Sequence, residues 1–346
     1  MVIPFEDEYR KKFYALEEKI FDSNMWSEGQ MIREFEEKFG EYVHTGARAI
    51  ADGGAALLAI LSYIDVRGKD VIVPSNTFWA DAQAIKYAGG NPIFADCNKN
   101  DLSLSLESLK TKVTGNTKAI ILVHIGGHIA FETEKIARFC KKRNIELIED
   151  CAHVHGAWWN GKTGGNYGIA GAYSFYATKT MPLGDGGMVV SNNKDLLKYV
   201  EEFRNYGKEV VDGQVYYRMK EGFNFRLSEF NAAMGIIQME RLEHILSWKR
   251  ELARKYDQIF ENRVQFPNGM VSGYYKYIVF DTPLQQETGQ VFGPRDLGHR
   301  IAEMEADLPN SVWVTEHHKC APIYFGWEYA NKSVDELRNI LLGERA

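Results

Sequence analysis

Cysteine is scarce in this chain of 346 residues, which contains only Cys97, Cys140, Cys151 and Cys320. The four are widely spaced, and no two of them form a Cys-x-x-Cys pair. This pattern excludes a small secreted scaffold held together by disulfides, because such scaffolds carry many closely spaced cysteines. We therefore predict a reducing, cytoplasmic environment.

Long apolar runs and an excess of positive charge are also absent. No apolar run reaches the roughly 18 residues that a membrane-spanning helix needs, and the acidic N-terminus lacks the apolar part of a signal peptide. With 41 Lys and Arg against 47 Asp and Glu, the formal net charge is -6 and the pI is near 5.9. This balance points to neither a nucleic-acid nor a membrane partner, so any anionic ligand must be bound by local groups.

The residues that are present have the composition of a folded enzyme. Hydrophobic residues make up 45% of the chain and aromatic residues 13%, which is enough for a sizeable core. Short β-rich segments alternate with helical ones, and this alternation predicts an α/β fold with a mostly parallel sheet covered by helices on both faces. Ligands of such folds bind beyond the carboxyl ends of the strands. The predicted strands are 70–74, 92–96, 118–124 and 145–150, and the predicted helices between them are 80–87 and 132–142.

A change of pattern near residue 245 predicts a domain boundary. We expect residues 1–245 to form an N-terminal arm and a large domain, and residues 246–346 to form a smaller α+β C-terminal domain. Around this boundary, helices are predicted at 227–242, 248–260, 295–306 and 334–342, a strand at 274–280, and loops at 207–222 and 282–294.

Lys179 is the first candidate for a catalytic residue. It follows the apolar run 169–175 and precedes the glycine-rich turn 184–187, where backbone without Cβ atoms can approach a flat ligand closely. Burial would disfavour its ammonium form and leave an amine able to form a Schiff base with a carbonyl, most commonly that of pyridoxal phosphate. The alternative for this segment alone is an exposed lysine in a loop between two strands.

An acid and two histidines follow the predicted strand 145–150, and three interpretations of them compete. Asp150, His153 and His155 could ligate zinc or iron, although no recognised ligand spacing accompanies them. They could be structural polar residues at the edge of the core. Asp150 could instead pair with the pyridine nitrogen of a cofactor bound to Lys179, so that the ring serves as an electron sink. The third interpretation accounts for both segments.

Gly53 and Gly54 open an apolar helix, and the start of that helix is a candidate phosphate site. Free backbone N–H groups and the positive end of the helix dipole attract anions there. The alternative is a tight turn before a buried helix, because a Gly-Gly pair alone is a weak signal.

Six segments taken together resemble one family in order and spacing. They identify the chain as similar to the DegT/StrS sugar aminotransferases, over roughly residues 26–256. Members are pyridoxal phosphate enzymes of fold type I, the aspartate aminotransferase fold, and most aminate keto groups on nucleotide-linked sugars. The segments are 52–57, 73–78, 149–157, 174–179, 184–187 and 224–226.

The resemblance implies a role for each candidate residue. Lys179 would form the Schiff base and then move protons, while Asp150 would bind the pyridinium nitrogen. The cofactor phosphate and ring would be bound by the backbone of Gly54 and Ala55, the Ser174 hydroxyl, Phe78 stacked on the ring, His153 on its face or phenolic oxygen, and Asn224 from a neighbouring subunit. The resemblance therefore implies a homodimer with shared active sites.

The function that the resemblance implies is transfer of an amino group, most plausibly from glutamate, to a nucleotide-linked keto-deoxysugar by a ping-pong mechanism. Amination of a keto cyclitol such as an inosose, and a non-catalytic pyridoxal phosphate-binding regulatory protein, are the alternatives. Gly54 and Asp185 replace a threonine and a glutamate common in the family, and residues 281–346 follow its pattern faintly. Lys179 argues against the related branch that carries histidine there and dehydrates sugars. No metal site is predicted.

Overall fold

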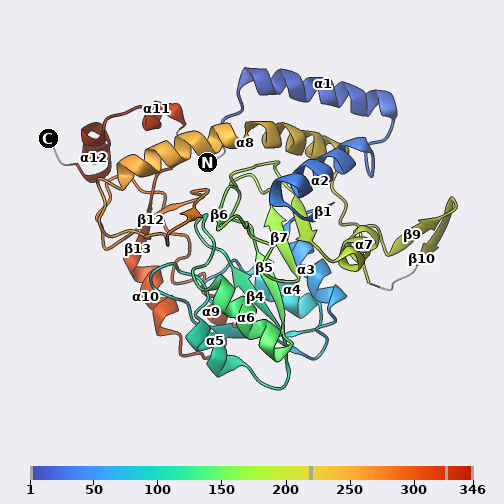
Figure 1. Cartoon of the computed structure of the whole chain (residues 1–346), viewed down its shortest axis with the longest axis horizontal. Helices are drawn as coiled ribbons and strands as arrows, with labels where there is room; N and C mark the ends of the chain where they lie inside the picture. Colours follow the sequence, from blue (N-terminus) through green and yellow to red (C-terminus); the bar gives the residue numbers. More distant parts are fainter. Residues whose placement is uncertain (1–2, 218–220, 324–325, 344–346) are drawn as a thin grey trace.

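A seven-stranded sheet forms the centre of the computed structural model, which describes residues 3–217, 221–323 and 326–343 (Figure 1). Strands β7, β5, β4, β2 and β3 are parallel, and β8 runs antiparallel to both of its neighbours, β1 and β7. The mostly parallel sheet predicted from the sequence is therefore present. In spatial order the strands are β1 (Gly46–Ile50), β8 (Gly187–Ser191), β7 (Ala170–Ser174), β5 (Glu146–Asp150), β4 (Thr117–Val123), β2 (Asp70–Pro74) and β3 (Asn91–Ala95).

Helices cover both faces of this sheet because its strands are apolar on both sides. In β4, Ile121 and Val123 face one core, while Ile120 and Leu122 face another. The first core is completed by α3 (Gly53–Tyr63), α4 (Ala80–Tyr87) and α7 (Lys194–Phe203). The opposite face is covered by α5 (Leu106–Lys112), α6 (Thr133–Arg143), α2 (Gln30–Val43) and α8 (Glu229–Tyr256). This is the three-layer arrangement predicted for the large domain.

The long helix α8 has 28 residues and runs beside α1 (Asp7–Ser23) along one side of the molecule (Figure 1). The sequence pattern predicted two helices, 227–242 and 248–260, but the apolar face continues through Ile245, Leu246 and Trp248, all of them buried. The predicted boundary at residue 245 lies inside this helix, and the division into two domains stays a prediction.

The C-terminal part contains a two-stranded antiparallel sheet and short helices. Strand β12 (Tyr277–Phe280) pairs with β13 (His318–Ala321). The predicted helix 334–342 is present as α12 (Val334–Leu342), but the predicted helix 295–306 is reduced to α9 (Gly298–Ile301). The remaining elements here are α10 (Pro309–His317), α11 (Trp327–Ala330) and β11 (Met270–Val271), which pairs with β6 (Trp158–Trp159).

A β-hairpin replaces most of the polar loop predicted at 207–222. Strands β9 (Lys208–Val211) and β10 (Gln214–Tyr217) project from the body of the protein in Figure 1. Asp212 and Gly213 both have positive φ angles, of 50° and 77°, as a two-residue turn between twisted strands requires. The hairpin exposes large apolar side chains at Val210, Val215 and Tyr217.

None of the helices in the described part of the chain is both long and apolar enough to cross a membrane. The four cysteines are buried and unpaired. The cytoplasmic location inferred from the cysteine content stays a prediction.

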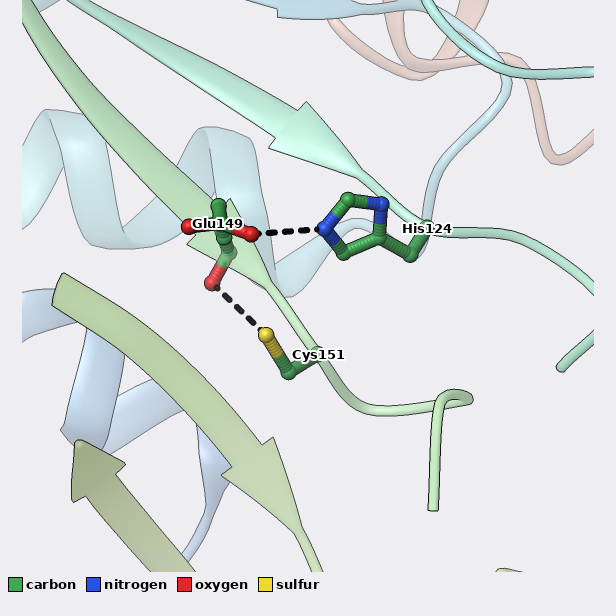
Figure 2. A group of neighbouring side chains, drawn as sticks. All are labelled: His124, Glu149 and Cys151. Carbon is green, nitrogen blue, oxygen red and sulfur yellow. Dashed lines mark hydrogen bonds and ion pairs between the residues drawn. The ribbon is translucent and has the colours of Figure 1, made fainter. Parts of the chain in front are cut away.

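A buried carboxylate, Glu149, joins the end of β5 to two neighbouring segments. One of its oxygens accepts hydrogen bonds from the backbone of Tyr167 and Gly168, each at 2.8 Å. The other accepts from the backbone of Gly165 and from His124 Nε2, each at 2.9 Å (Figure 2). Because the side chain is fully buried, these bonds replace water around the charge and fix the loop before β7 against the sheet.

We expect Glu149→Ala to lower the free energy of unfolding by more than about 3 kcal/mol, because it leaves three buried or partly buried backbone N–H groups without acceptors. Glu146→Ala is the matched control. Glu146 lies on the same strand and is partly exposed, so its loss should cost less than about 1 kcal/mol. Urea unfolding of both variants measures the difference. Equal losses would contradict the role assigned to Glu149.

Candidate active site

A cavity of about 610 Å³ lies at the carboxyl ends of the central strands. Residues at the carboxyl ends of β4, β5 and β7, or in the loops that follow these strands, line one side of it. The other sides are lined by α3, α4 and the segments 275–276 and 290–292. The residues that line it include Asp52, Gly54, Phe78, Asp81, Asp150, His153, Ser174, Lys179, Tyr275 and Lys276. The structure therefore brings most of the predicted site residues to one place.

The N-terminus of α3 lies against the end of β7 because glycine occupies the contact. A Cβ atom on Gly53 would lie 3.0 Å from Ser174 Cβ, and one on Gly187 would lie 2.3 Å from the backbone oxygen of Asp52. Side chains at these positions would push the three segments apart. The helix start and the Ser174 hydroxyl are thus adjacent, as a phosphate site requires.

One predicted phosphate donor is already in use. The backbone N–H of Ala55 donates to Asp52 Oδ1 at 2.9 Å, which makes Asp52 the N-cap of α3. The backbone N–H of Gly54 has no partner within the helix, because it belongs to the first turn. Gly54 and Ser174 are therefore the donors best placed for a phosphate, and Ala55 could contribute only if the cap opened.

Lys179 lies in a turn between β7 and β8, where its backbone N–H donates to the carbonyl of Tyr176 at 2.8 Å. Its ammonium lies 5.0 Å from the centre of the Tyr275 ring and has no hydrogen bond or ion pair with the residues that the structure describes. Burial lowers the pKa of Lys179 to about 8, against the opposing effect of the Asp150 carboxylate. A lysine of this kind supplies a nucleophilic amine near neutral pH.

Two carboxyl groups, those of Asp150 and Asp81, lie near the amine of Lys179. Asp150 accepts a hydrogen bond from the backbone of Ala152 at 2.8 Å, and burial raises its pKa. Asp81, from the first turn of α4, is also buried. Burial raises the pKa of Asp81 well above its usual range, and the charge of Asp150 raises it further. The two acids are thus close enough to interact, and burial disfavours the charged form of each.

The aromatic candidates border the same space. Phe78 is 75% exposed although it is a large apolar side chain, so it offers a free ring face to a planar ligand. His153 stacks on Tyr275 with ring centres 4.1 Å apart, and Gly126 donates its backbone N–H to His153 Nδ1 at 3.4 Å. Burial lowers the pKa of His153 well below its usual range, so its ring is neutral at pH 7.

Asn224 does not line this cavity. It is exposed at the base of the β9–β10 hairpin, where it forms a β-bridge with Asn205. Its predicted contact with a cofactor bound by another subunit stays a prediction.

The three residues considered as metal ligands do not converge. His153 stacks on Tyr275, whereas His155 is buried against Tyr173 and Phe175. A different group has the spacing of metal ligands, namely His124, Glu149 and Cys151 (Figure 2). Both ring nitrogens of His124 already form hydrogen bonds and are not free to bind a metal. Nδ1 accepts from the backbone N–H of Ala130 at 3.1 Å, and Nε2 is bonded to Glu149. This group is a structural network.

The residues around the cavity fit pyridoxal phosphate. They provide an amine with a lowered pKa at Lys179, a buried carboxyl group at Asp150, a helix N-terminus beside Ser174 and an exposed ring at Phe78. Asp81, which lines the cavity, also has one buried oxygen, Oδ1, without a hydrogen-bond partner among the described residues. The Asp52 cap disfavours a phosphate, because it places a carboxylate at the helix start.

Four residues of the cavity were missed in the sequence. Asp81 falls inside an apolar helical run, and Tyr275 and Lys276 fall in a segment predicted only as a strand. Asp52 directly precedes the Gly53–Gly54 pair, so its capping role could have been inferred from the preference of N-cap positions for aspartate. For the other three the sequence carries no local signal, because their place in the cavity depends on long-range packing.

Comparisons with known proteins show which proteins this chain resembles. The model of the DegT/DnrJ/EryC1/StrS aminotransferase family matches residues 7–286. GDP-perosamine synthase of Escherichia coli O157:H7 is 38% identical over 241 residues, which are 69% of this chain and 65% of that protein. The dTDP-3-amino-3,6-dideoxy-alpha-D-galactopyranose transaminase of Aneurinibacillus thermoaerophilus is 34% identical over 272 residues, 75% of this chain and 73% of that protein. The match to the first relative thus spans less than two thirds of its length.

Solved structures support the fold. A DegT DnrJ EryC1 StrS aminotransferase from Brucella abortus superposes with a TM-score of 0.87 at 23% identity, over 97% of each chain. This likeness confirms the predicted fold type I architecture.

The pKa of Lys179 predicts how the apoprotein reacts with an acylating reagent. The rate of Lys179 acetylation by acetic anhydride should rise with pH and reach half its maximum near pH 8, because only the free amine reacts. Asp150→Asn should move this midpoint downward, since the carboxylate favours the ammonium form. Peptide mass mapping measures the rate, and exposed lysines with pKa values of about 10.4 serve as an internal reference. A midpoint equal to theirs would refute the burial argument.

Proposed function

The chain belongs to the DegT/DnrJ/EryC1/StrS aminotransferase family, and on this premise we propose that it is a pyridoxal phosphate-dependent aminotransferase acting on a nucleotide-linked keto-deoxysugar. The observation that carries the proposal is that Lys179 and Asp150 line one cavity together with the N-terminus of α3. A protein that only bound a ligand would not need a lysine whose pKa is lowered to about 8.

When bound, pyridoxal phosphate would supply the carbonyl that carries the amino group between substrates and the ring that withdraws electrons from the reacting carbon. The Gly54 N–H and the Ser174 hydroxyl would bind the phosphate, and Phe78 would cover one face of the ring. These residues would hold the cofactor beside Lys179.

Lys179 has two tasks in this proposal. Its neutral amine would attach the cofactor, and once a substrate amine has replaced it, the free Nζ would move the proton that amino transfer displaces. A pKa near neutrality suits both tasks, because the same nitrogen must accept and release a proton within one turnover.

Asp150 would keep a proton on the ring nitrogen, which requires the carboxylate form. Burial opposes this form, whereas the hydrogen bond from Ala152 and the charge of Lys179 favour it. His153 is neutral and would contact the ring without adding positive charge.

The names of the relatives support a nucleotide-linked sugar as the amino acceptor, since one is a GDP-perosamine synthase and another a dTDP-sugar transaminase. Glutamate as the donor and a ping-pong order are part of the proposal. A single cavity that contains the reacting amine suits a mechanism in which the two substrates bind in turn.

A homodimer with shared sites is also part of the proposal. Asn224 lies outside the cavity of its own chain, at the base of a hairpin that exposes Val210, Val215 and Tyr217. Burying these side chains against a second copy would remove apolar surface from water, and would bring the hairpin of one copy to the other.

The proposed activity can be tested with glutamate and a panel of nucleotide-linked keto sugars, with an inosose as the cyclitol alternative. Asp150→Asn should slow turnover about tenfold to over a hundredfold, because it weakens a charge-assisted hydrogen bond worth about 1.5 to 3 kcal/mol. The rate of 2-oxoglutarate formation measures the effect.

Full activity of Asp150→Asn would contradict the role of Asp150 even if the sugar were aminated. If only the inosose is aminated, the amino acceptor is a cyclitol and not a nucleotide-linked sugar. A protein that binds pyridoxal phosphate but transfers no amino group to any acceptor would support the regulatory alternative.

Shared sites predict complementation between inactive chains. Lys179→Ala and Asn224→Ala chains that are unfolded and refolded together should form mixed dimers with one intact site, and should recover up to about a quarter of wild-type activity per chain in a random mixture. Size-exclusion chromatography and tagged chains verify the mixed dimers. Verified mixed dimers that stay inactive would contradict the sharing of sites.

A further inference from the structure

Lys276 is a second lysine in the active-site cavity, and the proposed chemistry does not use it. It directly precedes β12 and lines the cavity together with Lys179. Its backbone N–H donates to the carbonyl of Gly126 at 2.9 Å. A Cβ atom on Gly127 would lie 2.4 Å from the backbone nitrogen of Tyr275, so the loop after β4 and the start of β12 are in close contact. The position of Lys276 is therefore fixed by the backbone.

The ammonium of Lys276 has no anionic partner in the part of the chain that the structure describes. None of the hydrogen bonds or ion pairs there involves its Nζ, although the side chain is only partly exposed. Asp257, which borders an adjoining cavity of about 310 Å³ with Lys276, is bonded to Arg263 at 2.5 Å and to the Tyr277 hydroxyl at 2.8 Å. The Nζ atom of Lys276 lies 5.6 Å from the centre of the Tyr275 ring, and this ring carries no net charge. An anionic ligand would supply the opposite charge that the partly buried ammonium lacks.

The electrostatic effect of Lys276 places it near the reacting amine. Burial is the main cause of the low pKa of Lys179, Asp150 opposes it, and the charge of Lys276 lowers it further. The same charge lowers the pKa of His153, after burial and Lys179. Lys276 is thus close enough to act on both residues that face the ring of the proposed cofactor.

This position differs from the phosphate site at the start of α3. Ser174 ends β7, Asp150 ends β5, and Gly126 follows β4, and these three strands are neighbours in that order. With strands about 4.8 Å apart, the end of β7 lies about 10 Å from the end of β4. Lys276, attached to the loop after β4, therefore offers a second place for an anion on the other side of Asp150.

We propose that Lys276 binds an oxyanion of a substrate, supplied either by the carboxylate of the amino donor or by a phosphate of the nucleotide-linked sugar. This inference rests on the proposed aminotransferase function and adds the residue that selects a negatively charged substrate. The donor is the expected source, because its carboxylate is bonded to the carbon that carries the amino group and so arrives beside Lys179.

The kinetic test compares Lys276→Met, which removes the charge, with Lys276→Arg, which keeps it. Lys276→Met should raise KM for glutamate about 10- to 100-fold with a smaller change in kcat, as loss of a charge-assisted contact predicts. Lys276→Arg should retain most of the affinity. If KM for the sugar rises instead, the oxyanion is the phosphate. Unchanged KM for both substrates would overturn the proposal.

A second test does not depend on turnover and uses glutarate as a carboxylate probe on the full-length apoprotein. Glutarate bound at Lys276 should raise the pH midpoint of Lys179 acetylation, because it brings negative charge near the amine. In Lys276→Met the midpoint should be higher than in the wild type without glutarate, and glutarate should no longer shift it. A glutarate shift that persists in Lys276→Met would place the anion elsewhere and contradict the proposal.

Lys319→Met is the matched control, because Lys319 lies on the neighbouring strand β13, pairs with Glu287 at 2.8 Å and does not line the cavity. It should change neither KM nor the midpoint. If the wild type transfers no amino group, the proposed function fails, while the glutarate test still decides whether Lys276 binds a carboxylate.

Discussion

The buried Glu149 carboxylate is the contact on which the geometry of the site depends. Its oxygens accept four hydrogen bonds from His124 and from the backbone of the loop 165–168. Because successive residues of a strand point to opposite faces, fixing Glu149 also fixes the direction of Asp150, which faces the cavity. The loop held by Glu149 leads into β7, and β7 ends at Ser174. The hydrogen bonds of Glu149 thus help to position the Asp150 carboxyl group and the Ser174 hydroxyl of the proposed cofactor site.

Chemistry at this site depends on a balance of charges around one amine. Burial and the Lys276 ammonium favour the neutral form of Lys179, while Asp150 and Asp81 favour its ammonium form. The result is a pKa of about 8, which neither burial nor pairing alone would give. The Asp52 side chain, which caps α3 and also lines the cavity, lies at the proposed phosphate site. That cap means that phosphate binding must rely on Gly54 and Ser174 more than on the whole first turn of α3.

Strands with continuous apolar sequence, such as β2 and β4, were predicted from the sequence to within one residue at each end, because burial on both faces leaves a strong local signal. The hairpin at 208–217 was missed, although an Asp-Gly pair between Val-Val and Gln-Val-Tyr-Tyr is a hairpin signal. Lys179 and Asp150 were found through motifs. Asp81 and Lys276 were not, because only the packing of α4 and β12 against the sheet brings them to the cavity.

The account depends most directly on Lys179 as the residue that bonds to the cofactor. Two other lysines compete for that role, namely Lys276 in the cavity and Lys249, whose pKa burial lowers to about 7. The protein should be incubated with pyridoxal phosphate, reduced with borohydride, digested and mapped by mass spectrometry. The account predicts one label per chain, on Lys179, and none in Lys179→Ala. A label on Lys249 or Lys276 in the wild type, or no label, would contradict it.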